Sequence, residues 1–366
     1  MLKRFTVSNF KNFESEVVLD FSKTREYSFN NNLIKNGLAN KVLIYGENSS
    51  GKSNLGAAIM DITNHLTDYN GSNNMLYAYY INGNTVDDEV KFKYEFLFNE
   101  KEIEYVYTKD AYRNLLSEKL YENHNLIFEY NYKTNKFTNR IKESSTIDLS
   151  KRTQNISVIK FIYNNTLNHS NTSPIYLLMD FVNNMLWFRS LKENEFMGVM
   201  ANGEDLNDFI INNRKLNEFE DFLHNCGQNY KLCTIEENGR KVIGVEYRNY
   251  KASFFYVSST GVKTLLLFFY WMNRLNKISF IYLDEFDAFY HYELSRYILN
   301  FVNEKEDTQS VLTSHNSFLI DNELMRPDCY LLLKDGRLES FANRTNKTIR
   351  QAHNLEKMWI AKEFDK

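Results

Sequence analysis

Alternation of apolar and polar residues marks most of the strands that the first half of the sequence predicts. Residues 2–7 and 17–21 alternate in this way, and so do 90–98, 103–107 and 126–132. Strict alternation is typical of a strand with one buried and one exposed face, so the three later segments predict antiparallel strands. Between the two groups, the short apolar run 41–45 ends at Gly46 and precedes a predicted helix over about residues 52–65.

The second half of the chain changes period. Residues 174–225 predict helices, and two short strands are expected on either side of the turn at Asn238 and Gly239. From about Ala252 the pattern predicts a helix, a strand at 278–283, another helix and a strand at 310–313. We expect the apolar strand at 41–45 and the strands of this later α/β segment to share one sheet.

This pattern predicts one core domain with an insertion. Residues 1–70 and 250–366 would form the two halves of the core, and residues 71–249 an inserted region of β-strands and helices. The polar, Gly- and Asn-rich residues 71–83 are the expected exit from the first half. The insertion has no sustained heptad pattern, so long coiled-coil arms are not expected.

Composition narrows the class of protein without identifying it. The 366 residues carry a formal net charge of −3, which gives no overall signal for nucleic acid or an anionic membrane. Cys226, Cys233 and Cys329 lack the spacing of a zinc site or a disulfide framework. The most apolar run, 265–272, is far shorter than the roughly 20 residues of a membrane helix. A cytoplasmic protein without a signal peptide or membrane span is expected.

The segment GENSSGKS at residues 46–53 fits the phosphate-binding loop pattern G-x-x-x-x-G-K-[ST]. Main-chain N–H groups of such a loop cradle phosphate oxygens, with Lys52 on the β- and γ-phosphates and the Ser53 hydroxyl on Mg²⁺. The alternative is a chance glycine turn, but a predicted strand before it and a helix after it favour the phosphate loop. The residues expected to bind nucleotide here are Gly46, Asn48, Ser49, Ser50, Gly51, Lys52, Ser53 and Asn54.

An apolar strand that ends in two adjacent carboxylates, FIYLDE at residues 280–285, is the second candidate motif. Asp284 would lie beside the metal, and Glu285 would orient and deprotonate the water that attacks the γ-phosphate. Alone, the pattern is equally consistent with a solvated acidic turn. Together with the phosphate loop it predicts an NTP-hydrolysing site.

Two further segments indicate which class of phosphate-loop protein this is. SSTGVKTL at residues 258–265 has a small Ser-x-Gly turn before a helix, and TSH at 313–315 follows the next apolar strand. Ser259 is equally consistent with an ordinary helix N-cap and with a turn that contacts phosphate. The two interpretations are compatible, because a capped helix N-terminus also binds anions. A lone His315 is usually structural, but its place after the other motifs favours a γ-phosphate contact.

In this order the motifs resemble the small ABC-type ATPases of bacterial phage-defence and restriction islands, the RloA/AbiL group, which are relatives of the OLD, RecF and SMC heads. The resemblance also rests on the opening NFKNF at residues 9–13 and the late NLEKM at 354–358. It implies an α/β fold, an ABC/SMC-RecF-type P-loop NTPase head with a mixed sheet and an inserted antiparallel-β plus helical lobe. It implies that Lys11 approaches the nucleotide, that Asp287 lies at a dimer interface, and that Ser259 and Gly261 contact a γ-phosphate bound by a second subunit.

Two departures from that family pattern concern the site. Thr260 stands where many ABC proteins have Gly, and no Q-loop glutamine is identified within residues 71–249. The resemblance implies an ATP- and Mg²⁺-dependent ATPase, catalysed by Glu285, His315 and Lys52, with Ser53 and Asp284 at the metal. Its heads would pair as a homodimer or higher oligomer that sandwiches ATP.

Such a nucleotide-driven switch would regulate a separate effector, a nuclease or toxin, in antiviral defence or abortive infection. Only residues 316–366 follow His315, too few for the nuclease domain of OLD proteins, so effector chemistry is expected on another chain. The alternative is a RecF-like DNA-binding repair ATPase, and DNA or RNA binding stays open. A regulatory GTPase is disfavoured, because no N-K-x-D guanine motif is present.

Overall fold

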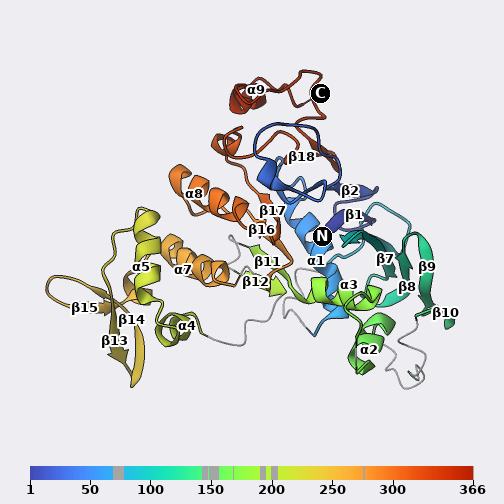
Figure 1. Ribbon diagram of the computed structural model, residues 1–366, viewed down its shortest axis with the longest axis horizontal. Coiled ribbons are helices and arrows are strands. Elements are labelled where there is room, and N and C mark those ends of the chain that lie inside the picture. Colours follow the sequence, from blue (N-terminus) through green and yellow to red (C-terminus); the bar gives the residue numbers. More distant parts are fainter. Residues whose placement is uncertain are drawn as a thin grey trace.

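The computed structural model describes residues 1–68, 78–141, 147, 156–167, 169–189, 195–198, 205–274 and 277–365. Two seven-stranded sheets, a smaller three-stranded sheet and several helices make up this part of the chain (Figure 1). The prediction of an α/β fold that contains a mixed sheet is confirmed. None of the helices described is long and apolar enough to cross a bilayer.

The core sheet is mixed and has the strand order β12-β11-β16-β17-β5-β18-β19. Its five central strands are parallel, and β12 and β19 pair antiparallel at its edges. The central strands are almost wholly buried, as expected for a parallel sheet covered on both faces. The strands are β5 (Lys41–Tyr45), β11 (Met185–Arg189), β12 (Glu195–Gly198), β16 (Phe280–Asp284), β17 (Gln309–Thr313), β18 (Tyr330–Lys334) and β19 (Arg337–Ser340).

The second large sheet is antiparallel throughout and joins the N-terminus to the middle of the chain, in the order β10-β9-β8-β7-β6-β1-β2. Its buried face is aromatic: Phe92, Tyr94, Phe96, Tyr105 and Tyr107 are at most 1% exposed. The strands are β1 (Leu2–Ser8), β2 (Val17–Asp20), β6 (Val90–Phe98), β7 (Lys101–Lys109), β8 (Leu115–Glu122), β9 (Asn125–Asn131) and β10 (Lys136–Asn139).

Helix α1 (Lys52–Leu66) lies between the two large sheets and is buried on both sides. On one side Gly56 packs against Tyr282 of the core sheet, and on the other the Tyr94 hydroxyl donates to the carbonyls of Ala58 and Ile59. Helices α7 (Thr260–Met272) and α8 (Tyr292–Asn303) cover the opposite face of the core sheet (Figure 1). The molecule is therefore layered as helices, sheet, helix and sheet.

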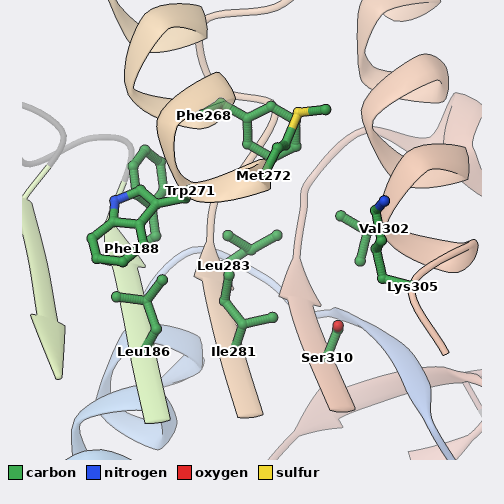
Figure 2. Close-up of a pocket in the computed structure, with 10 residues that line it drawn as sticks. All are labelled: Leu186, Phe188, Phe268, Trp271, Met272, Ile281, Leu283, Val302, Lys305 and Ser310. Carbon is green, nitrogen blue, oxygen red and sulfur yellow. The ribbon is translucent and has the colours of Figure 1, made fainter. Parts of the chain in front are cut away.

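Figure 2 shows the interface between the core sheet and helices α7 and α8. Leu186, Phe188, Ile281 and Leu283 point from the strands towards Phe268, Trp271 and Met272 of α7. The gap among these side chains has a volume of about 10 Å³, no more than one water requires, so it is a packing seam and not a ligand site. Because side chains alternate along a strand, the intervening residues of β11 and β16 face α1.

The remaining elements surround this core. A three-stranded sheet with its own helices lies at one end of the molecule, beside α7, and α9 lies near the C-terminus at the top (Figure 1). These elements are β13 (Leu232–Glu237), β14 (Arg240–Glu246), β15 (Lys251–Ser253), α4 (Leu206–Asn212), α5 (Leu216–Asn225), α6 (Phe254–Val257), α2 (Val158–Asn165), α3 (Pro174–Asn183), α9 (Leu355–Ile360), the short pair β3 (Ile34–Lys35) and β4 (Leu38–Ala39), and the 3₁₀ turns Asn31–Leu33 and Ser317–Leu319.

The expected common sheet of the first and last α/β segments is confirmed, because β5 pairs with β17, and β17 with β16. The purely helical prediction for residues 174–225 is wrong at β11, a core strand whose apolar run follows the apolar helix α3 after one residue. Short apolar runs do not distinguish a buried strand from a buried helix by period.

The division into core and insertion stays a prediction, and its first boundary, between residues 70 and 71, lies within 69–77, outside the described ranges. In the sheets the two predicted parts are interleaved. β6 of the middle region pairs with β1, and β11 pairs with β16.

Candidate nucleotide-binding site

The loop between β5 and α1 has the backbone that its glycines and serines allow. Ser49 and Gly51 have φ angles of 66° and 108°, in the left-handed region. A Cβ at position 51 would lie 2.5 Å from Asn12 Nδ2 and 2.7 Å from the Phe13 ring, so only glycine fits there. Gly51 is also the N-cap of α1 and has no side chain to cover the helix N-terminus, where unpaired N–H groups favour an anion.

Lys52 folds back across this loop. Its Nζ donates to the carbonyls of Gly46 at 3.0 Å and Glu47 at 3.2 Å. Burial lowers the pKa of the Lys52 ammonium, while the nearby carboxylates of Glu285 and Asp284 raise it. The Lys52 ammonium is thus bound to carbonyls of its own loop and also interacts with the charges of Asp284 and Glu285.

Asp284 ends β16 on the face of the core sheet that α1 covers. Thr313, at the end of the neighbouring β17, donates its hydroxyl to Asp284 Oδ1 at 3.0 Å. Burial raises the pKa of Asp284, and hydrogen bonds from Ser53 and Thr313 oppose that rise. A serine hydroxyl and a carboxylate thus meet at the start of α1, and both are hard oxygen ligands of the kind that Mg²⁺ prefers.

Glu285 has a φ angle of 48°, which is uncommon for a residue with a side chain. The surrounding structure holds it there, because the Glu285 main-chain N–H donates to Thr313 Oγ1 at 2.7 Å. Its Oε1 lies 3.6 Å from His315 Nε2. Backbone strain of this kind persists where neighbours fix it, often at functional sites.

These groups surround one hollow of about 380 Å³, in the size range of small-molecule sites. Asn12 braces its wall by donating to the Ser50 carbonyl at 3.2 Å and accepting from Asn54 Nδ2 at 2.7 Å. The residues that line the hollow are Asn12, Asn48, Ser49, Gly51, Lys52, Ser53, Asn54, Glu285 and His315. The structure thus brings together most residues predicted from the phosphate loop, Glu285 and His315.

The other predicted site residues lie around this hollow and do not line it. Lys11 lines a neighbouring hollow, where its Nζ donates to the Ala78 carbonyl at 2.9 Å. Gly46 and Ser50 belong to the phosphate loop but do not line the hollow, and Ser50 Oγ is 2.6 Å from the position of a Cβ on Gly46. Asp287 accepts from Ser314 Oγ at 2.7 Å, and burial raises its pKa.

Ser259 and Gly261 begin α7. Ser259 is its N-cap and accepts from the Val262 N–H at 3.4 Å, as the ordinary N-cap reading predicts. Gly261 lies against the carbonyl of Phe289, 3.3 Å from the position of an added Cβ, in the loop that follows β16. Neither residue is part of the wall around the phosphate loop of its own chain.

Sequence reasoning missed Thr313 and Arg189. Arg189 ends β11 in register with Asp284, and its guanidinium lies 5.0 Å from the centre of the Trp187 ring. It is 9% exposed. A basic residue at the end of a buried apolar strand was the available signal, but the strand itself was predicted as helix. For Thr313, the signal was a hydroxyl residue at a strand end beside the acidic pair.

Comparison with solved structures finds SMC head domains. A head bound to the C-winged helix domain of ScpA is 13% identical with a TM-score of 0.49, over 93% of this chain and 96% of that chain. The head domain from Thermotoga maritima is 14% identical with a TM-score of 0.45, over 93% and 97%. A head with a coiled coil and joint from Pyrococcus yayanosii is 11% identical with a TM-score of 0.49, over 100% and 99%.

None of the curated proteins matches the sequence. The family described as "AAA domain, putative AbiEii toxin, Type IV TA system" matches residues 42–321. That range includes the phosphate loop, Ser259, Gly261, Asp284, Glu285 and His315, and it spans well over half of the chain. The chain therefore belongs to this family of AAA domains.

Proposed function

We propose that this chain binds ATP with Mg²⁺ in the hollow around Lys52 and hydrolyses it, as one half of a nucleotide-driven dimer switch. The supporting observation is a convergence of separate chain segments. Lys52 of the phosphate loop, Glu285 after β16 and His315 after β17 line one hollow at the carboxyl ends of parallel strands. Ligands bind at this edge of open α/β sheets.

Nucleotide binding uses the loop and the two oxygen ligands beside it. Phosphate oxygens accept from the loop N–H groups, and Lys52 leaves the Gly46 and Glu47 carbonyls to contact the β- and γ-phosphates. Ser53 and Asp284 would hold Mg²⁺, which would neutralise negative charge on the phosphates. The described residues include no group of three or more His, Cys, Asp or Glu that could hold a metal ion, and a phosphate-bound Mg²⁺ needs only one or two protein ligands.

Hydrolysis depends on Glu285. Its carboxylate accepts the proton of a water that attacks the γ-phosphorus, and the bond to the β,γ-bridging oxygen breaks. His315, 3.6 Å from Glu285, donates to the γ-phosphate as negative charge develops on it. Thr313 positions both carboxylates, through its hydroxyl to Asp284 and by accepting the Glu285 N–H.

A second copy of the chain completes the site. Ser259 and Gly261 lie at the N-terminus of α7, away from the hollow of their own chain, where an anion is favoured. When two heads face one another, each brings this turn to the γ-phosphate of its partner, with Asp287 at the interface. ATP then joins the heads, and hydrolysis separates them.

The proposed biological role is based on the description of the family to which the chain belongs. Its description names a putative toxin and a type IV toxin–antitoxin system. The head switch would accordingly hold or release a separate effector, a nuclease or toxin, in defence against phage. Copurification from the native host tests this role: the effector should associate differently with Glu285→Gln and Lys52→Ala forms, and recovery of a transporter subunit instead would contradict it.

The ATPase itself is tested with Glu285→Gln. We expect ATP hydrolysis to fall about 10²- to 10⁴-fold, the usual contribution of a general base, while ATP binding persists and a dimer accumulates. Phosphate release and light scattering measure the two effects. Glu293→Gln, an exposed change in the first turn of α8, is the matched control. Hydrolysis by Glu285→Gln at the wild-type rate excludes Glu285 as the base, and a preference for GTP would favour the GTPase alternative.

A further inference from the structure

His315 lies in the short connection between β17 and the 3₁₀ turn Ser317–Leu319. Its side chain is 40% exposed and its Nε2 is 3.6 Å from Glu285 Oε1, so packing around the ring does not by itself fix its position. On the side of β17 the main chain is held by the sheet, because the Ser314 N–H donates to the Ile44 carbonyl of β5 at 3.3 Å. The position of the imidazole therefore depends on what holds the main chain on its other side.

Tyr45, the last residue of β5, holds that other side. Its hydroxyl donates to the main-chain carbonyl of Asn316, the residue after His315, at 3.0 Å. Tyr45 is 2% exposed and directly precedes Gly46, the first residue of the phosphate loop. One buried side chain thus joins the start of the phosphate loop to the peptide that follows His315.

The C-terminal helix α9 supports the Tyr45 ring. The Tyr45 ring lies 5.6 Å from the Trp359 ring of α9 and 6.0 Å from the Phe341 ring, and these two rings stack on one another at 5.4 Å. The same helix contacts the connection directly, because Ser317 Oγ donates to Glu356 Oε1 at 3.3 Å. The segment after His315 is therefore held from two directions, by β5 and by α9.

A second tyrosine holds the far end of the same connection. The Tyr330 hydroxyl of β18 donates to the Leu319 carbonyl at 2.7 Å and accepts from the Asp321 N–H at 3.0 Å. A buried tyrosine hydroxyl usually has a hydrogen-bond partner whatever its role, so burial alone does not separate the two residues. Their positions do, because only the Tyr45 hydroxyl bonds to the peptide that adjoins His315.

We propose that Tyr45 is a positioning residue for ATP hydrolysis, which holds the peptide after His315 so that the imidazole meets the γ-phosphate in the transition state. This inference rests on the proposed function, in which His315 is the donor. A donor stabilises developing charge only from the correct position, and a misplacement of about 1 Å costs up to about 10²-fold in rate. Trp359 supports the Tyr45 ring, so α9 contributes to catalysis without touching the nucleotide.

Steady-state ATP hydrolysis by the full chain tests this inference. His315→Ala should lower kcat about 10²- to 10³-fold, the usual loss for one transition-state donor. Tyr45→Phe keeps the ring and removes only the hydroxyl. We expect it to lower kcat about 10- to 100-fold and to leave KM unchanged, because the positioned bond forms in the transition state. Tyr330→Phe is the matched control, which should lower the thermal unfolding midpoint at least as much and keep the wild-type kcat.

The double change Tyr45→Phe with His315→Ala separates positioning from a general loss of stability. If Tyr45 acts through His315, removal of its hydroxyl should have no further effect on kcat once the imidazole is absent. Trp359→Leu removes the ring behind Tyr45 at a half-buried position and should follow the same pattern. It provides a second test should Tyr45→Phe unfold at the assay temperature.

Three outcomes would overturn the inference while the wild type hydrolyses ATP and His315→Ala does not. Tyr45→Phe could keep the wild-type kcat, Tyr330→Phe could lose as much kcat as Tyr45→Phe, or the losses from Tyr45→Phe and His315→Ala could multiply in the double variant. If the wild type is inactive, or His315→Ala hydrolyses ATP at the wild-type rate, the proposed function itself fails and the inference fails with it. The wild type and His315→Ala thus distinguish the two failures.

Discussion

The Tyr282 hydroxyl of β16 donates a 2.6 Å hydrogen bond to the main-chain carbonyl of Lys52, in the phosphate loop. Both groups are buried, and the two residues are far apart in the sequence. The strand that carries the acidic pair is thereby fastened to the first turn of α1. This bond can form because the glycine at position 56 lets α1 lie close to the core sheet. A Cβ at Gly56 would lie 2.8 Å from the Tyr282 ring and 3.1 Å from the Trp187 ring.

Gly56→Ala should therefore loosen this contact. The alanine gains up to about 1 kcal/mol of helix propensity, but the overpacking against two buried rings costs about 1–3 kcal/mol. We expect a net loss of unfolding free energy and weaker ATP binding, measured by urea unfolding and calorimetry. Gly83→Ala is the control for the unfolding free energy, because a Cβ there meets nothing within 4 Å. If Gly56→Ala kept the wild-type unfolding free energy and ATP affinity, α1 could move away from the core sheet without cost, and the prediction would be wrong.

Contiguous motifs could be predicted from the sequence, because each is a local backbone geometry at a strand end. The phosphate loop, the acidic pair after β16 and His315 after β17 are of this kind, and the parallel pairing of β5, β17 and β16 brings them together. Each motif needs only a strand, a turn and the right residue. Because all three motifs follow parallel strands of one sheet, they lie at the same edge of that sheet.

Relationships between distant segments could not be predicted. Arg189 and Asp284 are register partners only because β11 inserts beside β16, and nothing local announces that β11 is a strand. The contact of Lys11 with Ala78 joins two loops that are 67 residues apart in the sequence. Thr313 is one of many threonines until the fold places it between the Asp284 carboxylate and the Glu285 main-chain N–H. Side-chain partners of this type depend on strand order, which periodicity does not encode.

A buried ion pair joins α1 to the antiparallel sheet, and its loss should be costly. Lys109 Nζ lies 2.5 Å from Asp61 Oδ1, and both side chains are at most 2% exposed. The Tyr80 and Tyr107 hydroxyls donate to the same carboxylate. Burial lowers the pKa of Lys109, and the Asp61 charge opposes this.

Lys109→Met leaves that buried carboxylate without its cation. We expect the unfolding free energy to fall by about 3–5 kcal/mol in urea unfolding. The double change Asp61→Asn with Lys109→Met removes both charges and should recover part of the loss. Lys91→Met, on the exposed face of β6, is the control. Additive effects of the two single changes would show that the pair is not coupled.

Lys41, at the start of β5, should make stability depend on pH. Its Nζ donates to the carbonyls of Lys305 and Thr308, and burial, with a contribution from Lys35, lowers its pKa to about 7. In the unfolded chain the pKa of this lysine is close to its ordinary value of 10.5, so above pH 7 the unfolded state binds more protons.

The unfolding free energy should consequently rise from pH 7 towards pH 9, with a slope of at most about 1.4 kcal/mol per pH unit from this group. Lys41→Met removes the titrating group and should flatten the rise. Urea unfolding at pH 7, 8 and 9 compares the two slopes. Parallel curves for both proteins would assign the pH dependence to other groups.

Mixing two inactive variants tests whether the site is built from two chains. Lys52→Ala disables the phosphate loop, and Gly261→Arg blocks the turn before α7, where even a Cβ lies 3.3 Å from the Phe289 carbonyl. In a mixed dimer, the intact loop of the Gly261→Arg chain meets the intact turn of the Lys52→Ala chain. One complete site then forms, so ATP hydrolysis should return on mixing although each variant alone is inactive. If Ser259 and Gly261 acted within their own chain, no combination of these two variants would hydrolyse ATP.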